Sequence, residues 1–182
     1  MVAYPTFASV LAIPEAPQTT LVLGGARSGK SRYAEEIMIR HSRPWIYLAT
    51  AQALDDEMRH RVAEHQARRG EGWVTVETPI AVSDVLRREA TRPVLVDCLT
   101  LWLSNLILGE HDLPAATADL VAVLNRRQTP TVLVSNEVGL GIVPETPLGR
   151  SFRDEAGRLN QAMAALAGKV VFMVAGLPMT VK

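Results

Sequence analysis

The feature that most constrains the fold is a short apolar strand that leads directly into a complete phosphate-binding loop. Residues 21–23 are Leu-Val-Leu, and residues 24–31, Gly-Gly-Ala-Arg-Ser-Gly-Lys-Ser, match the pattern G-x-x-x-x-G-K-[ST] throughout. Residues 32–39 have helix-forming composition, so the loop is expected at a helix N-terminus, where backbone N–H groups bind anions. An ordinary Gly-rich turn is the alternative, but the flanking strand and helix favour a bound nucleoside triphosphate.

The residue types in this loop indicate what each part of it does. Lys30 supplies a mobile cation for the β- and γ-phosphates, and the Ser31 hydroxyl can ligate Mg²⁺, the metal we expect with the nucleotide. Glycines let the backbone wrap closely around a polyphosphate. The nucleotide-binding residues expected in the loop are Gly24, Gly25, Ala26, Arg27, Ser28, Gly29, Lys30 and Ser31.

Length and composition indicate one globular domain in a reducing compartment. The 182 residues suffice for one sizeable core, and 19 basic residues balance 19 acidic ones, which argues against nucleic acid or an anionic membrane as partner. The lone cysteine, Cys98, excludes an intrachain disulfide and favours the cytoplasm. No apolar stretch is long enough to span a bilayer stably. Residues 1–19, with three prolines and no basic segment, are interpreted as a poorly ordered leader ahead of a single catalytic domain over 20–182.

Apolar runs alternate with helix-like stretches along the chain. Buried strands are predicted at 20–23, 45–49, 93–97, 131–135 and 169–175, with a short final strand near Val181. Helices are predicted at 31–41, 55–69, 80–89, 117–128 and 152–167, and a surface loop at 109–114. This alternation predicts a three-layer α/β domain around a mostly parallel sheet.

Polar residues follow several predicted strands at the edge where such sheets bind ligands. Thr50 with Gln52 follows one strand, Thr100 comes soon after another, and residues 135–137, Ser-Asn-Glu, follow a third. Asp97 closes the run Val-Leu-Val, the arrangement of a Walker B element, whose carboxylate holds Mg²⁺ directly or through water. A turn cap is the alternative role for Asp97, and Glu137 is the second candidate for the metal.

The predicted helix 55–69 carries a histidine among arginines. His65 follows Met58 and Val62 at spacings of seven and three residues, so it lies on the inward face, with Arg61, Arg68 and Arg69 along the same helix. A histidine so placed can act as a nucleophile toward phosphorus. A partly buried packing histidine on a solvated, charged helix is the competing interpretation. His60 and His65 are five residues apart, which does not suit a shared metal on one helix face.

Several blocks together resemble the bifunctional adenosylcobinamide kinase/adenosylcobinamide-phosphate guanylyltransferase family of cobalamin biosynthesis. They are the phosphate loop, residues 47–52, the Asp-Asp-Glu-Met of 55–58 with Arg61 and His65, residues 73–79, the Asn-Glu-Val-Gly-Leu-Gly-Ile-Val-Pro of 136–144, and residues 152–161. The resemblance covers about residues 20–182 and implies a RecA-like P-loop fold. It also implies two reactions. A nucleoside triphosphate, ATP or GTP, phosphorylates adenosylcobinamide, and GTP transfers GMP through a histidine to adenosylcobinamide phosphate.

By position, the resemblance assigns roles to individual residues. His65 matches the guanylylated histidine. The other nucleotide contacts that it implies are Ala49, Thr50, Ala51, Gln66, Ala67, Arg68, Arg69, Glu77 and Asp97. Asp97 departs from the glutamate that can occupy this place, and it is one methylene shorter. Homo-oligomers, trimers among them, are a further implication.

Two other functions fit the phosphate loop and Asp97. One is a single-activity small-molecule kinase, in which His65 only packs, and the other is a non-catalytic nucleotide-binding module. A RecA-like DNA-dependent ATPase is disfavoured by the zero net charge and the lack of a long basic patch. Trp73, Trp102, Met163 and Met173 are expected in the core rather than at a corrinoid site.

Overall fold

The computed structural model describes residues 18–52 and 69–182. The strands are β1 Thr19–Gly24, β2 Trp45–Ala49, β3 Trp73–Glu77, β4 Val94–Asp97, β5 Thr131–Val134, β6 Lys169–Val174 and β7 Leu177–Thr180. The helices are α1 Lys30–Met38, α3 Val82–Arg88, α4 Leu99–Leu108, α5 Leu113–Arg126 and α6 Pro147–Leu166. The predicted leader, apart from its last two residues, and the predicted helix 55–69, apart from Arg69, lie outside the described residues.

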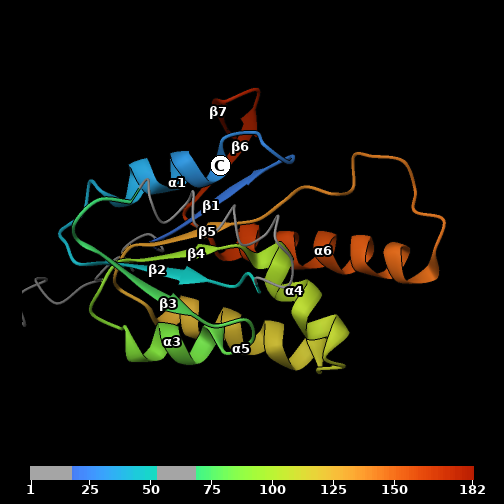
Figure 1. Ribbon diagram of the computed structural model, residues 1–182, viewed down its shortest axis with the longest axis horizontal. Helices are drawn as coiled ribbons and strands as arrows, with labels where there is room; N and C mark the ends of the chain where they lie inside the picture. The colour runs from blue at the N-terminus through green and yellow to red at the C-terminus, as the bar shows by residue number, and fades with distance from the viewer. Residues whose placement is uncertain (1–17, 53–68) are drawn as a thin grey trace, which may run out of the picture.

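The strands form one sheet in the order β3-β2-β4-β5-β1-β6-β7. Every adjacent pair is parallel except β6 and β7, which are antiparallel. Helix α1 packs on one face against β1, β4 and β5, while α3, α4, α5 and α6 pack together on the other face (Figure 1). The three-layer α/β prediction is thereby confirmed.

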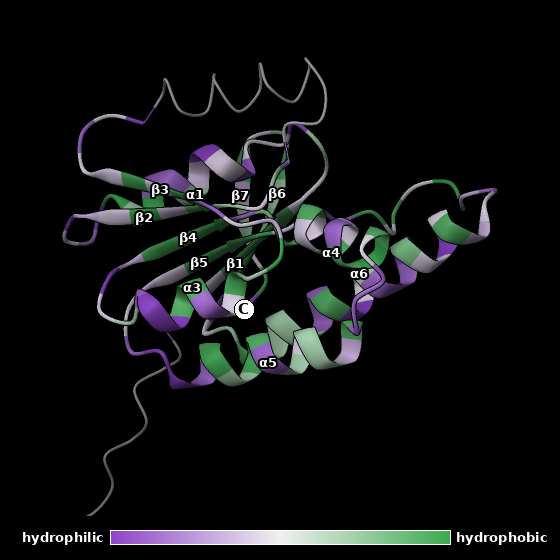
Figure 2. Ribbon diagram, turned by 60° about the horizontal axis from the view of Figure 1, so that its bottom comes forward, coloured by the Kyte–Doolittle hydropathy of each residue, from purple (hydrophilic) through white to green (hydrophobic). Residues whose placement is uncertain are grey.

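Two apolar cores hold the helices on the sheet. The central strands are hydrophobic on both sides because both faces of the sheet are covered there, and Figure 2 shows the hydrophobic colour along β4, β5 and β1. The larger core, under α3–α6, includes Trp102, Leu124 and Met163, and the smaller, under α1, includes Tyr47, Leu95 and Met173. Trp102, Met163 and Met173 are buried, as the sequence predicts.

Two elements were not predicted. Strand β3 lies at the edge of the sheet and is largely exposed, so its residues lack the continuous apolar run of a central strand. Helix α4 is separated from β4 by a single residue, Cys98, and is so apolar that no polar face marks its period. β7 is the short final strand expected near Val181, although it ends one residue earlier, at Thr180.

Two helices begin earlier than predicted because capping residues start them. The carboxylate of Asp112 accepts a hydrogen bond from the backbone N–H of Ala115 (2.9 Å), so α5 begins inside the predicted surface loop 109–114. The Thr146 hydroxyl caps α6 in the same way, accepting from Gly149 N–H (3.1 Å). Each helix has a proline in its first turn, which is the preferred place for it.

Within the described parts of the chain, no helix has the length and apolar character needed to cross a membrane.

Candidate nucleotide-binding site

The phosphate loop joins β1 to α1 at the carboxyl edge of the sheet. Gly24 ends β1 with φ 150°, and a Cβ atom there would lie 2.7 Å from the Met173 carbonyl oxygen and 2.8 Å from Ser28 Oγ. Gly29 is the N-cap of α1 and has a left-handed φ of 92°. Both positions therefore require glycine, one because of a neighbouring backbone and the other because of its own conformation.

Lys30 is the buried cation of this loop. Its Nζ donates a hydrogen bond to the Gly25 carbonyl oxygen (2.5 Å), and only 7% of the residue is exposed. Burial lowers the pKa of Lys30 below its ordinary value, and the nearby Cys98 and Asp97 partly oppose this. A triphosphate beside Lys30 would favour its charged form further.

The loop also contains a hydroxyl suited to a phosphate. Ser28 Oγ is buried and has no hydrogen-bond partner among the residues that the structure describes. Buried hydroxyls are rarely left unpaired, so this donor indicates a polar ligand in the loop. The N-terminus of α1 has no acidic residue in its first turn, which leaves its positive end to an anion.

Asp97 lies at the end of β4, and β5 separates β4 from β1 in the sheet. Tyr47 on β2 donates a hydrogen bond from its hydroxyl to Asp97 Oδ2 (2.8 Å). In the register of the sheet, Asp97 stands opposite Val134 of β5, which stands opposite Val22 of β1, two residues before the loop begins. Carboxylate and hydroxyl oxygens are the hard ligands that Mg²⁺ prefers, so Asp97 and the half-exposed Ser31 fit that ion.

Arg69 is brought to the same region by an aromatic contact. Its guanidinium carbon lies 3.4 Å from the centroid of the Tyr47 ring, and Tyr47 also meets Trp73 edge-on at 6.2 Å between ring centroids. Trp73 in turn packs against Trp45 at 5.4 Å. The structure thus joins Arg69, predicted to contact the nucleotide, to Asp97 through Tyr47.

Thr50 and Asn105 fasten the ends of neighbouring strands. The Thr50 hydroxyl donates to the Cys98 carbonyl oxygen (2.7 Å) and accepts from its N–H (2.8 Å). The Asn105 amide donates to the carbonyl oxygens of Thr50 (2.8 Å) and Pro79 (3.0 Å). Thr50 has no exposed surface, so its side chain serves the fold, and its nucleotide contact stays a prediction.

The segment after β5 is tied down by a buried polar network. The Ser135 hydroxyl donates to Asn160 Oδ1 (2.7 Å) and lies 3.2 Å from the Thr100 hydroxyl, which accepts from the Asn136 N–H (2.7 Å). The Glu137 N–H then donates to the Gly24 carbonyl oxygen (3.0 Å), which places Glu137 against the first residue of the loop. Glu137 Oε1 accepts from the Gly139 N–H (2.6 Å), so this carboxylate already supports a turn.

The remaining predicted residues divide by position. Ala49, Glu77 and Asp97 end three adjacent strands in register, and half-buried Ala51 follows β2. Four predicted residues lie outside the described part of the chain: His65, Gln66, Ala67 and Arg68. Sequence reasoning assigned no role to Tyr47, Asn105 or Asn160. A tyrosine inside an apolar run was the one available signal, since Tyr hydroxyls in cores need partners.

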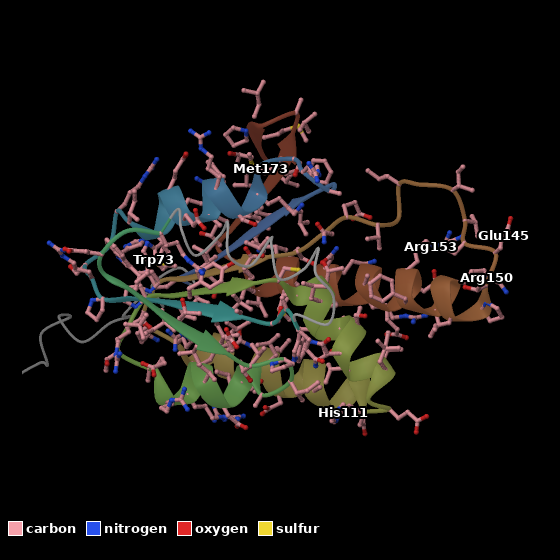
Figure 3. All side chains as sticks on the ribbon, in the orientation of Figure 1. Trp73, His111, Glu145, Arg150, Arg153 and Met173 are labelled. Atoms are coloured by element: carbon pink, nitrogen blue, oxygen red, sulfur yellow. The ribbon has the colours of Figure 1, made fainter. Side chains whose placement is uncertain are left out.

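A projecting arm lies away from this site. This arm is the segment of residues 135–146, which Figure 1 shows running out beyond the sheet before α6 returns. Arg150 donates to the carbonyl oxygens of Pro144 (3.1 Å) and Glu145 (2.6 Å), which fastens the arm to the first turn of α6. In Figure 3, Arg150 and Arg153 lie far from Met173, the residue that contacts Gly24. These two cations in the first turns of α6 therefore do not reach the phosphate loop of their own chain.

The sheet order, the loop and Asp97 define the class: an α/β protein of the P-loop nucleotide-binding type. A solved ATPase of the type III secretion system of pathogenic bacteria has the same kind of fold. Its TM-score is 0.53 at 13% identity, over 91% of this chain and 57% of that one. A likeness at this identity concerns the fold alone.

Sequence comparison gives the family. Residues 20–181 match the family described as cobinamide kinase/cobinamide phosphate guanyltransferase. The bifunctional adenosylcobalamin biosynthesis protein CobP of Pseudomonas aeruginosa is 50% identical over 166 residues, covering 89% of this chain and 96% of that protein. The protein CobU of Escherichia coli, with the same description, is 41% identical over 179 residues, with 89% and 98% covered. The chain belongs to this transferase family, which confirms the resemblance found in the sequence.

Proposed function

We propose that this chain performs two transfers in cobalamin biosynthesis. It phosphorylates the hydroxyl of the aminopropanol arm of adenosylcobinamide with ATP or GTP, and it then transfers GMP from GTP to the resulting adenosylcobinamide phosphate. The observation that carries the proposal is the complete phosphate loop, with Lys30 buried in it, in a chain that matches the family over residues 20–181. Both transfers begin from a bound triphosphate, so one loop serves both.

In the kinase step, positioning and charge neutralisation do most of the work. Lys30, Ser28 and the N-terminus of α1 supply donors to the phosphates. Ser31 and Asp97 would hold Mg²⁺, which neutralises charge on the β- and γ-phosphates when bound. The substrate oxygen forms a bond to the γ-phosphorus as the bond to the β-phosphate oxygen breaks, and the hydroxyl proton is released.

In the guanylyl step, His65 is the proposed nucleophile. A ring nitrogen of His65 forms a bond to the α-phosphorus of GTP, and the bond to the pyrophosphate oxygen breaks, so pyrophosphate leaves. A phosphate oxygen of adenosylcobinamide phosphate then attacks the same phosphorus, and the phosphorus–nitrogen bond breaks to give adenosylcobinamide-GDP. Arg69, four residues after His65, supports this role because Tyr47 holds its guanidinium near Asp97.

Labelling the chain tests the proposal. The protein is incubated with Mg²⁺ and GTP labelled at the α-phosphate, and the chain is examined for label that acid releases and base does not. We expect label in the unchanged protein and in the control His111→Ala, whose exposed histidine follows α4 away from the loop (Figure 3). Label that is absent from the unchanged protein would contradict the guanylylated histidine and favour a single-activity kinase. Label that persists undiminished in His65→Ala would contradict His65 as the guanylylated residue. Nucleotide binding with no turnover in either step would favour the non-catalytic module.

We further propose a homo-oligomer, with the trimer as the assembly implied by the family resemblance. The arm supports this, since it exposes apolar side chains, Ile142 by 97% and Leu140 by 82%. A groove of about 290 Å³ lies beside it, between α4 and α6. Sedimentation of Ile142→Asp against the unchanged protein tests the assembly, and an unaltered mass distribution would count against the arm as the interface.

The lone, buried Cys98 supports a cytoplasmic location.

A further inference from the structure

Tyr47 lies on β2, two residues before Ala49, the last residue of that strand at the candidate site. On β2 it stands opposite Leu95 of β4, whereas Ala49 stands opposite Asp97. Diagonal neighbours across a sheet are within reach only of long side chains, and the tyrosine hydroxyl spans this gap to donate to Asp97 Oδ2 (2.8 Å). The bond occupies one carboxylate oxygen and leaves the other for a ligand.

The ring of Tyr47 is held on its face and on its edge. The Arg69 guanidinium covers one face at 3.4 Å from the centroid, and Trp73 meets the ring at an interplanar angle of 76°. Tyr47 is 5% exposed. Packing at this density fixes a side chain in one rotamer, so the hydroxyl and the face of the ring have set directions.

The groups on either side of Tyr47 have capacity for ligands. Arg69 Nη1 is buried and has no hydrogen-bond partner among the described residues. A carboxylate can only accept, so at 2.8 Å from Asp97 Oδ2 the Tyr47 hydroxyl is the donor of this hydrogen bond.

We propose that Tyr47 is a positioning residue that sets two ligand-binding groups at once. Its hydroxyl orients the Asp97 carboxylate toward the Mg²⁺ of the nucleotide, and its ring holds the Arg69 guanidinium toward the phosphates. The inference rests on the proposed function, since it takes Asp97 as a metal-linked residue and Arg69 as a phosphate ligand. It adds a physical link between the phosphate loop and the residues that follow His65.

Binding measurements on Tyr47→Phe test the hydroxyl alone, because the ring beneath Arg69 is kept. The probe is a GTP analogue with a methylene group between the α- and β-phosphorus atoms, titrated by calorimetry with Mg²⁺ and again with a chelator. We expect the factor by which Mg²⁺ tightens binding to fall about tenfold, as for other residues that orient metal ligands, with metal-free binding unchanged. In Tyr47→Leu the ring is also lost, and metal-free binding should weaken about fivefold as well.

Controls separate this inference from the proposed function. Tyr33→Phe removes a phenolic hydroxyl from half-buried Tyr33 on α1 and should change neither measurement. Asp97→Asn should abolish most of the Mg²⁺ effect, and adding Tyr47→Phe to it should change nothing further, because the two act through one carboxylate. A full Mg²⁺ effect in Tyr47→Phe beside a lost one in Asp97→Asn overturns the inference and leaves the function standing. A full effect in Asp97→Asn overturns the metal role itself, and with it the task assigned to the Tyr47 hydroxyl.

Discussion

The side-chain amide of Asn160, on α6, donates a hydrogen bond to the carbonyl oxygen of Asn136, just after β5, with an N–O distance of 3.1 Å. The other end of the same amide accepts from the Ser135 hydroxyl at 2.7 Å. One buried residue thus pairs α6 with the two residues that precede Glu137, whose N–H bonds to Gly24. The position of α6 and the position of the phosphate loop are linked through this segment.

Replacing Asn160 should loosen that link. In Asn160→Ala, the Ser135 hydroxyl and the Asn136 carbonyl lose a buried partner, so we expect a loss of about 2 kcal/mol in the free energy of unfolding. Urea unfolding followed by circular dichroism measures it. Gln161→Ala, at the exposed neighbouring position of α6, is the control and should unfold like the unchanged protein. Equal stability of the two variants would show that the network contributes little.

Lys30→Ala should weaken both transfers, because both must hold a triphosphate. Loss of one charge-stabilising donor from a buried site typically costs about 10²-fold or more in rate. Steady-state assays of the kinase step and of the guanylyl step measure kcat/KM separately. Lys169→Ala removes an exposed lysine from the start of β6 and should match the unchanged protein. Near-normal guanylylation in Lys30→Ala would mean that the two steps do not share the loop.

Gly24→Ala should be strongly destabilising, whereas Gly25→Ala should not. A methyl group at position 24 would lie 2.7 Å from the Met173 carbonyl, but nothing lies within 4 Å of the same group at position 25. We expect a loss of about 3 kcal/mol for Gly24→Ala, since the clash is with backbone and φ is 150°. Thermal unfolding compares the two neighbouring glycines. Similar midpoints would contradict the close approach of β6 to the loop.

The Cys98 thiol should make stability fall at alkaline pH. Burial raises the pKa of Cys98 from 9.0 to about 12, so the folded chain holds this proton where the unfolded chain releases it. Its contribution is fully present below pH 9 and declines as the pH rises toward 12, with a slope of at most about 1.4 kcal/mol per pH unit. Unfolding of the unchanged protein and of Cys98→Ala between pH 8 and about pH 10.5 measures it. The difference between the two chains cancels other titrating groups, and a difference independent of pH would refute the buried thiol as its source.

Elements with a local signal were predictable. The central strands are recognisable in the sequence as continuous apolar runs, because both faces of the sheet are covered. The phosphate loop is recognisable as a contiguous pattern of eight residues. Strand β3 and helix α4 were not predicted, for opposite reasons. The edge strand is too exposed to form a continuous apolar run, and the buried helix is too apolar to show the alternation of polar and apolar residues that marks a helix. Both acquire their form from neighbours, β3 from pairing with β2 and α4 from packing against α5 and α6.

The class of ligand and the family could be predicted from the chain alone, because a phosphate loop is built by consecutive residues whose chemistry does not depend on distant contacts. Asp97 was likewise placed at a strand end, because the apolar run of residues 94–96 stops there. The surroundings of that carboxylate, in contrast, depend on how distant segments pack together. Tyr47 and Asp97 are 50 residues apart in the chain, and their hydrogen bond depends on the register of β2 against β4. Arg69 contacts the same ring from a third segment of the chain. Contacts of this kind leave no local sequence pattern, because they depend on the packing of distant segments rather than on residue spacing.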